Sequence, residues 1–140
     1  MAKTINLEDF FTEDHEKEGV WFEPKVKGIG CGIELLVTGI GTDENIVAAE
    51  HYDKESAELE NIKDPIERVR KQKALDANRV AEFVKGIRVV EGCDVKFNGG
   101  KLEYSVPLIQ QLMLKSPLIR SEVIRFVRDT TNFIKREKNA

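Results

Sequence analysis

Residues 106–134 read VPLIQQLMLKSPLIRSEVIRFVRDTTNFI, and this stretch supplies much of the apolar surface on which the fold depends. Ser105 and Ser116 each precede a proline-containing helical pattern. Serine is a favoured helix N-cap and proline is tolerated in the first turn, so the sequence predicts two C-terminal helices. Their apolar faces comprise Leu108, Ile109, Leu112, Met113 and Leu114 in the first, and Ile119, Val123, Ile124, Phe126, Val127, Phe133 and Ile134 in the second.

Much of this apolar surface must be core, because burial contributes ~25 cal/mol per Å² and no other segment offers a larger favourable term. Apolar residues that stay outside the core are available to a partner. We expect Phe133, one turn from a charged end, to be left outside. The candidate partner-binding residues are Ile119, Val123, Phe126, Phe133 and Ile134.

The middle of the chain has the start signals of two long helices. Thr42 can cap the first, and Asp64, followed by a proline, can cap a second that runs toward Gly86. We expect the narrow apolar stripe of the first helix, which includes Ile46 and Val47, to pack on a sheet. The charges of the second helix are typical of a solvated face, and they comprise Glu67, Arg68, Arg70, Lys71, Lys73, Asp76 and Arg79.

Extended segments flank this helical middle. Residues 19–27 alternate as a half-buried strand, which Pro24 restricts to a sheet edge, and the β-branched segment 31–40 fits a second strand paired with it. Residues 87–90 and 93–104 also look extended, and the Asn98-Gly99-Gly100 sequence predicts a tight hairpin turn. The expected fold class is α+β, with an N-terminal antiparallel β-hairpin, a helical middle, a small second hairpin and two C-terminal helices.

The chain length of 140 residues fits one domain spanning 1–140. We expect residues 1–18 to be a mobile acidic arm, with a short amphipathic turn followed by a solvated loop, and residues 135–140 to be a polar tail. No apolar run reaches signal-peptide or membrane-spanning length, which predicts a cytoplasmic protein.

Cys31 and Cys93 lack the spacing of a zinc or redox motif, so two buried, reduced thiols are favoured over a disulfide.

Composition disfavours several classes of function. The formal net charge of −3 gives no overall attraction to nucleic acid or anionic lipid. The glycine cluster at 28–32 is followed by a strand-like run, whereas a phosphate-binding loop needs a helix there. His15 and His51 have no ligand partners at suitable spacing, and the serines lack a nucleophile context. We therefore expect no enzyme activity, no catalytic or metal-binding residue and no cofactor.

The order of motifs resembles the tail assembly chaperones of long-tailed bacteriophages, of the siphophage type. The likeness runs from the strand 33–39 through Gly41-Thr42-Asp43-Glu44, the helix closing on Val84-Lys85-Gly86-Ile87, and Ser116-Pro117, to the Asp-x-x-Asn-Phe signature at Asp129–Phe133. The resemblance implies a non-enzymatic protein in the cytoplasm of the bacterial host. Its implied partners are the tape measure protein, which it would keep soluble, and the tail tube protein recruited around it.

Two other classes of function remain open. A small transcriptional regulator would use the helices around Pro107 and Pro117 as a helix-turn-helix, with Arg120, Arg125 and Arg128 contacting phosphates. That reading is weakened by the net acidic charge and by few side chains suited to base edges. A structural subunit of the phage tail or head-tail connector would need more strand than the sequence predicts.

Overall fold

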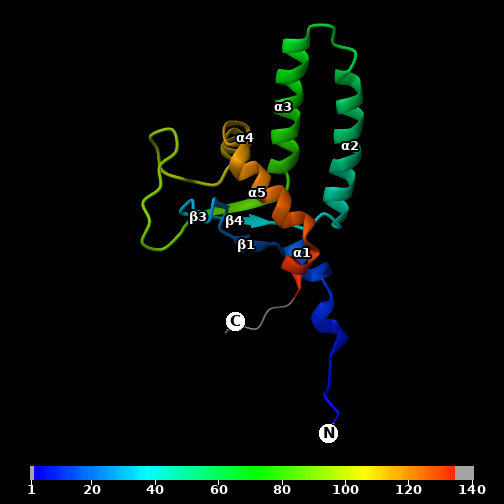
Figure 1. Cartoon of the computed structure of the whole chain (residues 1–140), viewed down its shortest axis with the longest axis vertical. Coiled ribbons are helices and arrows are strands. Elements are labelled where there is room, and N and C mark those ends of the chain that lie inside the picture. Colours follow the sequence, from blue (N-terminus) through cyan, green and yellow to red (C-terminus); the bar gives the residue numbers. More distant parts are fainter. Residues whose placement is uncertain (1, 135–140) are drawn as a thin grey trace.

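The computed structural model describes residues 2–134, and its architecture is α+β, as predicted (Figure 1). None of the helices in these residues is both long and apolar enough to cross a membrane. In chain order the elements are the 3₁₀ helix η1 (Leu7–Phe10), α1 (Glu13–Glu18), β1 (Val20–Phe22), β2 (Lys25–Val26), β3 (Ile29–Gly30), β4 (Ile33–Val37), α2 (Asp43–Leu59), α3 (Pro65–Ala81), β5 (Val84–Val89), α4 (Val106–Lys115), α5 (Pro117–Arg128) and the 3₁₀ helix η2 (Thr130–Phe133).

A three-stranded antiparallel sheet in the order β1–β4–β5 forms the base of the fold. Val20 pairs with Val37 across β1 and β4, which confirms the predicted antiparallel pairing of the N-terminal strands. The first strand is shorter than predicted because it ends before Pro24, and the residues beyond it form the separate ribbon β2–β3.

The third strand of the sheet was not predicted in full. The second long helix ends at Ala81, so the expectation that it runs toward Gly86 is wrong. Residues from Val84 onward instead form β5, in which Val89 pairs with Ile33 of β4. The near-helical spacing of valines was misleading, because Val84 is equally suited to fill the inner face of a strand, where it is buried.

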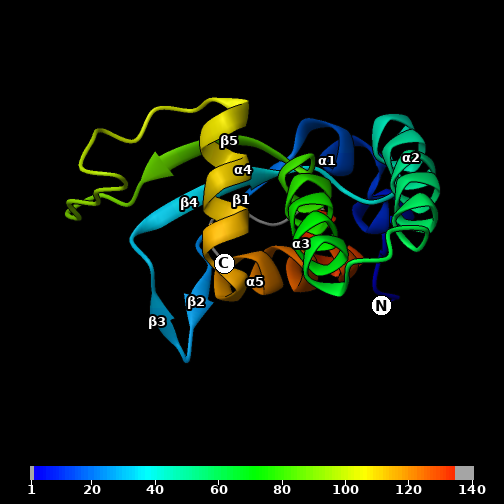
Figure 2. The same cartoon turned by 90° about the horizontal axis from the view of Figure 1, so that it is seen from above.

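One face of the sheet is buried under helices. Figure 2 shows α2 and α3 end-on and α4 crossing over the strands. Alternate residues of β4 point into this core, as the period of a strand requires. The buried apolar residues are Ile33, Leu35, Val37, Ala77, Val80, Ala81, Phe83, Val84, Ile109, Leu112, Met113, Val123, Val127 and Phe133.

The helices α2 and α3 form an antiparallel pair that projects away from the sheet (Figure 1). Thr42 and Asp64 cap their N-termini, as predicted. The prediction that α2 packs on the sheet is wrong, because Ile46 and Val47 are exposed and Asn45 is the one buried residue within α2. The main neighbour of α2 is α3, and Ala49, Tyr52 and Leu59 are the stripe residues of α2 that are half-buried.

The base of the helical pair is fixed by a buried amide. Asn45 donates from Nδ2 to the Thr38 hydroxyl at 2.9 Å and to the Gly39 carbonyl at 2.6 Å. Both acceptors lie just beyond β4, so these bonds connect the first turn of α2 to the end of the sheet. A buried amide without such partners would cost stability, which makes the position of α2 specific.

The predicted second hairpin is reduced to its turn. Asn98 and Gly99 both have positive φ angles of 56° and 71°, and Phe97 and Gly100 form an isolated antiparallel bridge. The flanking residues of 93–104 form no strand. One reason is that residues 87–89, which could have continued such a ribbon, are already paired with β4.

The N-terminal segment is more ordered in its second half than predicted. Residues 13–18 form α1 rather than a solvated loop. The Glu16 carbonyl accepts a bond from the Gly39 amide at 2.9 Å, and the Glu16 carboxylate accepts bonds from Thr12 and Gly41. Residues 2–12 precede this anchor and lead away from the body of the protein (Figure 1).

Candidate functional site

The structure places two of the predicted partner-binding residues inside the core. Val123 and Phe133 are both 0% exposed, so the expectation that Phe133 is left outside the core is wrong. The second C-terminal helix ends at Arg128, and the following 3₁₀ helix η2 turns Phe133 back toward the body. Periodicity along a single helix cannot reveal this reversal of direction.

The other predicted residues are partly buried. Phe126 stacks on Phe22 of β1 with ring centroids 4.1 Å apart, and it contacts Phe133 edge to face at 5.9 Å. Ile119 packs against the core cluster, and Ile134 is half-buried. These side chains mainly hold α5 and η2 on the sheet. A partner would therefore have to contact a different face of α5.

A groove between α3 and α5 is the strongest candidate site. It encloses about 560 Å³ and is lined by Ile40, Tyr52, Asp76, Arg79, Val80, Phe83, Arg120, Ser121, Ile124, Val127 and Arg128. We call this the α3–α5 groove. Its floor is apolar, because Val80, Phe83 and Val127 are buried core residues that reach the groove from below. Concave surfaces of this size that combine apolar side chains with a few polar groups are typical of binding sites.

Three arginines surround this floor. Arg79 lies over the Phe83 ring at 4.3 Å and donates to the Asn45 carbonyl at 3.2 Å, and Arg120 donates to the Met113 carbonyl at 3.3 Å. Within residues 2–134, no salt bridge joins Arg79, Arg120 or Arg128 to a carboxylate. With Asp76 as the one acidic residue of the lining, three positive charges against one negative leave a formal charge of +2.

Arg79 carries an unsatisfied donor. Its Nη1 atom is buried and has no hydrogen-bond partner among the described residues. Burial lowers the pKa of Arg79 from its ordinary value, with Glu82 and Asp53 acting in the opposite direction. The guanidinium nevertheless stays charged near neutral pH. An orphaned buried donor costs roughly 1–3 kcal/mol.

A hydrogen-bond network between α2 and α3 forms the upper wall of the groove. The Tyr52 hydroxyl donates to Asp76 at 2.6 Å, and Gln72 donates to Asp76 at 2.8 Å. The bond to Asp76 is the main cause that raises the pKa of Tyr52. Both donors are neutral, so these bonds orient the Asp76 carboxylate and leave its negative charge unchanged.

The arginines of α5 diverge. Arg120 and Arg128 face the α3–α5 groove, whereas Arg125 lines a different hollow beside β1 and pairs with Glu122 at 3.2 Å. Only Ser116 separates α4 from α5, whereas a helix-turn-helix uses a turn of about three to four residues. This geometry does not support docking of α5 on a phosphate backbone through all three arginines.

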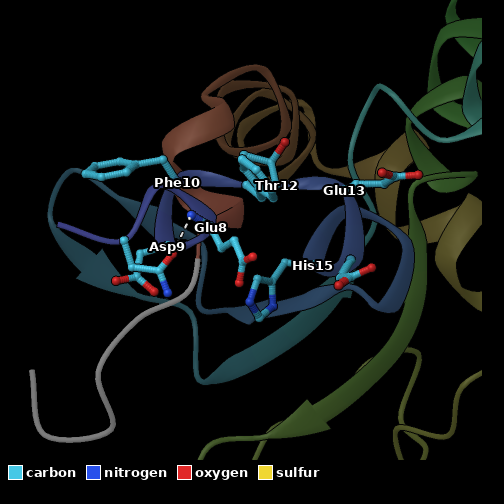
Figure 3. A pocket seen from close by; sticks show the side chains of 9 residues that line it. Glu8, Asp9, Phe10, Thr12, Glu13 and His15 are labelled. Carbon is cyan, nitrogen blue, oxygen red and sulfur yellow. Dashed lines mark hydrogen bonds between the residues drawn. The ribbon is translucent and has the colours of Figure 1, made fainter.

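A further hollow lies within the N-terminal segment itself (Figure 3). It encloses about 740 Å³, and its lining includes Glu8, Asp9, Glu13 and His15. All of its walls come from residues 6–15, so nothing in the body of the protein closes it. Within the described residues no group of His, Cys, Asp and Glu side chains is arranged to hold a metal ion.

The two cysteines are less buried than predicted. Both are free thiols, but Cys93 is exposed and Cys31 is only half-buried. Burial is the main cause that raises the pKa of the Cys31 thiol, which disfavours the reactive thiolate. Neither cysteine lines the α3–α5 groove.

Sequence reasoning did not identify the α3–α5 groove. Asp76 and Arg79 were assigned to a solvated face, although the apolar Val80 beside them could have signalled the end of a buried stripe. Together the fold and the groove define a small α+β protein with an open, basic, partly apolar groove. No family model matches the chain, and no curated protein or solved structure matches it.

Proposed function

We propose that this protein is a non-enzymatic binding protein whose α3–α5 groove holds an acidic amphipathic segment of a partner protein. The observation that carries this proposal is the set of three arginines, Arg79, Arg120 and Arg128, that form no salt bridge within residues 2–134 and line a groove with an apolar floor. Apolar side chains of the partner would cover Phe83 and Ile124, and its carboxylates would face the arginines. Helix-in-groove binding uses this combination of an apolar anchor with charged flanks.

The resemblance to siphophage tail assembly chaperones supplies a particular partner. On that reading the groove shields amphipathic segments of the tape measure protein in the cytoplasm of the bacterial host, and tail tube subunits are recruited to the complex. A highly charged chain, with 34% charged residues, suits a protein that must stay dispersed while it covers apolar segments. No feature of the groove favours the regulator or the structural subunit over this proposal.

The test is capture of partners from cells that also express the genes on either side of this one, with every captured chain identified by mass spectrometry. We expect a very long helical protein, a tail tube subunit or both. Arg128→Ala and Ile124→Ala should each reduce capture about 5- to 30-fold, since charge and apolar contacts of this kind contribute about 1–2 kcal/mol each.

Two matched controls lie on the same helix outside the groove lining. Arg125→Ala removes an arginine that lines the other hollow, and Leu118→Ala removes an exposed apolar side chain. Both variants should capture the partner as the wild-type protein does. Equal capture by all four variants would refute the groove as the binding site. Recovery of DNA alone would instead support the hypothesis that the protein is a transcriptional regulator.

A further inference from the structure

The N-terminal arm, residues 2–12, is an exposed amphipathic segment. Four large apolar side chains, those of Ile5, Leu7, Phe10 and Phe11, are all more than 60% exposed. Figure 3 shows the Phe10 ring on one side of this segment and the carboxylates of Glu8 and Asp9 on the other. A concentration of four exposed large apolar side chains within seven residues is unusual for a surface segment and indicates a candidate interaction segment.

The direction of the arm is set by α1. The Thr12 hydroxyl donates to Glu16 at 3.1 Å, and Glu16 is in turn bonded to the Gly39 and Gly41 amides. From this anchor the arm leads away from the protein, on the side opposite to the projecting α2–α3 pair (Figure 1). It therefore does not fold back onto the α3–α5 groove of its own chain.

The arm and the α3–α5 groove have complementary chemistry. The arm presents Phe10 and Phe11 next to Glu8 and Asp9, and the groove presents an apolar floor beside three arginines without salt bridges in residues 2–134. Complementary charge of this kind selects a partner and fixes its register.

We infer that the arm of one copy occupies the α3–α5 groove of a second copy of this chain. Reciprocal exchange places two identical arm–groove contacts in a closed, two-fold dimer. This inference rests on the proposed function in one respect, because both place a segment in the α3–α5 groove. The arm of the second copy would therefore compete with the partner segment, which must displace the arm before it can enter the groove.

A charge-swap experiment tests this arrangement with the purified chain alone. The arm variant E8K/D9K and the groove variant R120E/R128E each place like charges in contact when mixed only with themselves. Combining them pairs a basic arm with an acidic groove and an acidic arm with a basic groove, so both contacts of the dimer are restored. Molar mass is measured by light scattering across a wide range of protein concentration.

The wild-type protein is expected at twice its chain mass of 15.9 kDa at high concentration. Each reversed variant should dissociate at least about tenfold more readily, and an equimolar mixture of the two should regain the dimer mass. Arg125→Glu, in the neighbouring hollow, is the matched control and should dimerise as the wild-type does. A monomeric wild-type protein, or a mixture that stays monomeric, overturns the inference.

Folding of the groove variant must be checked separately, because Arg120 also donates to the Met113 carbonyl. If R120E/R128E loses its helical circular dichroism, the single variant Arg128→Glu at an exposed position replaces it. Deletion of residues 2–12 supplies an independent readout, since it should abolish the dimer and increase partner capture. Capture that depends on the groove without any dimer would refute this inference and leave the proposed function standing.

Discussion

Replacement of Phe133 by alanine should destabilise the whole protein. The side chain is 0% exposed and contacts the Phe126 ring at 5.9 Å. Burial of an aromatic side chain of roughly 200 Å² at ~25 cal/mol per Å² corresponds to about 5 kcal/mol. Alanine retains part of this surface but leaves a cavity, and Phe→Ala changes in cores cost about 3–5 kcal/mol. For a domain of this size, the melting temperature should fall by roughly 10–20 °C.

The assay is thermal unfolding followed by circular dichroism at low protein concentration, so that association does not contribute. Phe10→Ala is the matched control, because it removes the same side chain from a position that is 62% exposed. The control should change stability by less than about 0.5 kcal/mol. If Phe133→Ala melts within a degree or two of Phe10→Ala, then η2 does not hold Phe133 in the core and the described packing of α5 is wrong.

Three further changes test the polar contacts of the fold. Asn45→Ala should cost about 1–3 kcal/mol in urea unfolding, because it leaves the buried Thr38 hydroxyl without its donor. The hydrogen bond to Asp76 raises the pKa of Tyr52 above its ordinary 10.0. The stability that this bond contributes is therefore fully present below pH 10.0 and is lost as the pH rises through the folded-state pKa. The urea midpoint of the wild-type protein should fall in that alkaline range, and the midpoint of Tyr52→Phe should fall less steeply. Ser116→Ala removes the N-cap of α5 and should cost about 1 kcal/mol by thermal unfolding, whereas an unchanged melting temperature would contradict the capping role.

Helix starts were the part of the fold that local sequence determined best. Thr42, Asp64, Ser105 and Ser116 each accept a hydrogen bond from an amide in the first turn, as their residue types predict. A cap acts over three residues, so the sequence contains nearly all of the relevant information. The first strand pair was predictable for a related reason, since alternation of apolar residues reports directly on a half-buried strand.

The missed features all depend on contacts distant in sequence. β5 is a strand because β4 lies beside it, although the two are separated by the whole α2–α3 pair. Phe133 is buried because η2 reverses the chain, although the three residues that precede it in sequence are polar. The α3–α5 groove likewise combines residues 40, 52, 76–83 and 120–128, which no local pattern connects. Tertiary packing therefore decided which apolar residues became core and which remained at the surface.

The projecting α2–α3 pair implies a gradient of local stability along the molecule. Its base is fixed by the buried Asn45 amide, whereas Ile46, Val47, Ile66 and Val69 are exposed and the contacts above the base are largely polar. Segments with few buried apolar contacts open locally without global unfolding. Native-state hydrogen exchange should therefore be fastest at the tip of the pair and slowest in β4. The two helices can fray from the tip and reform while the sheet, and the floor of the groove upon it, stay intact.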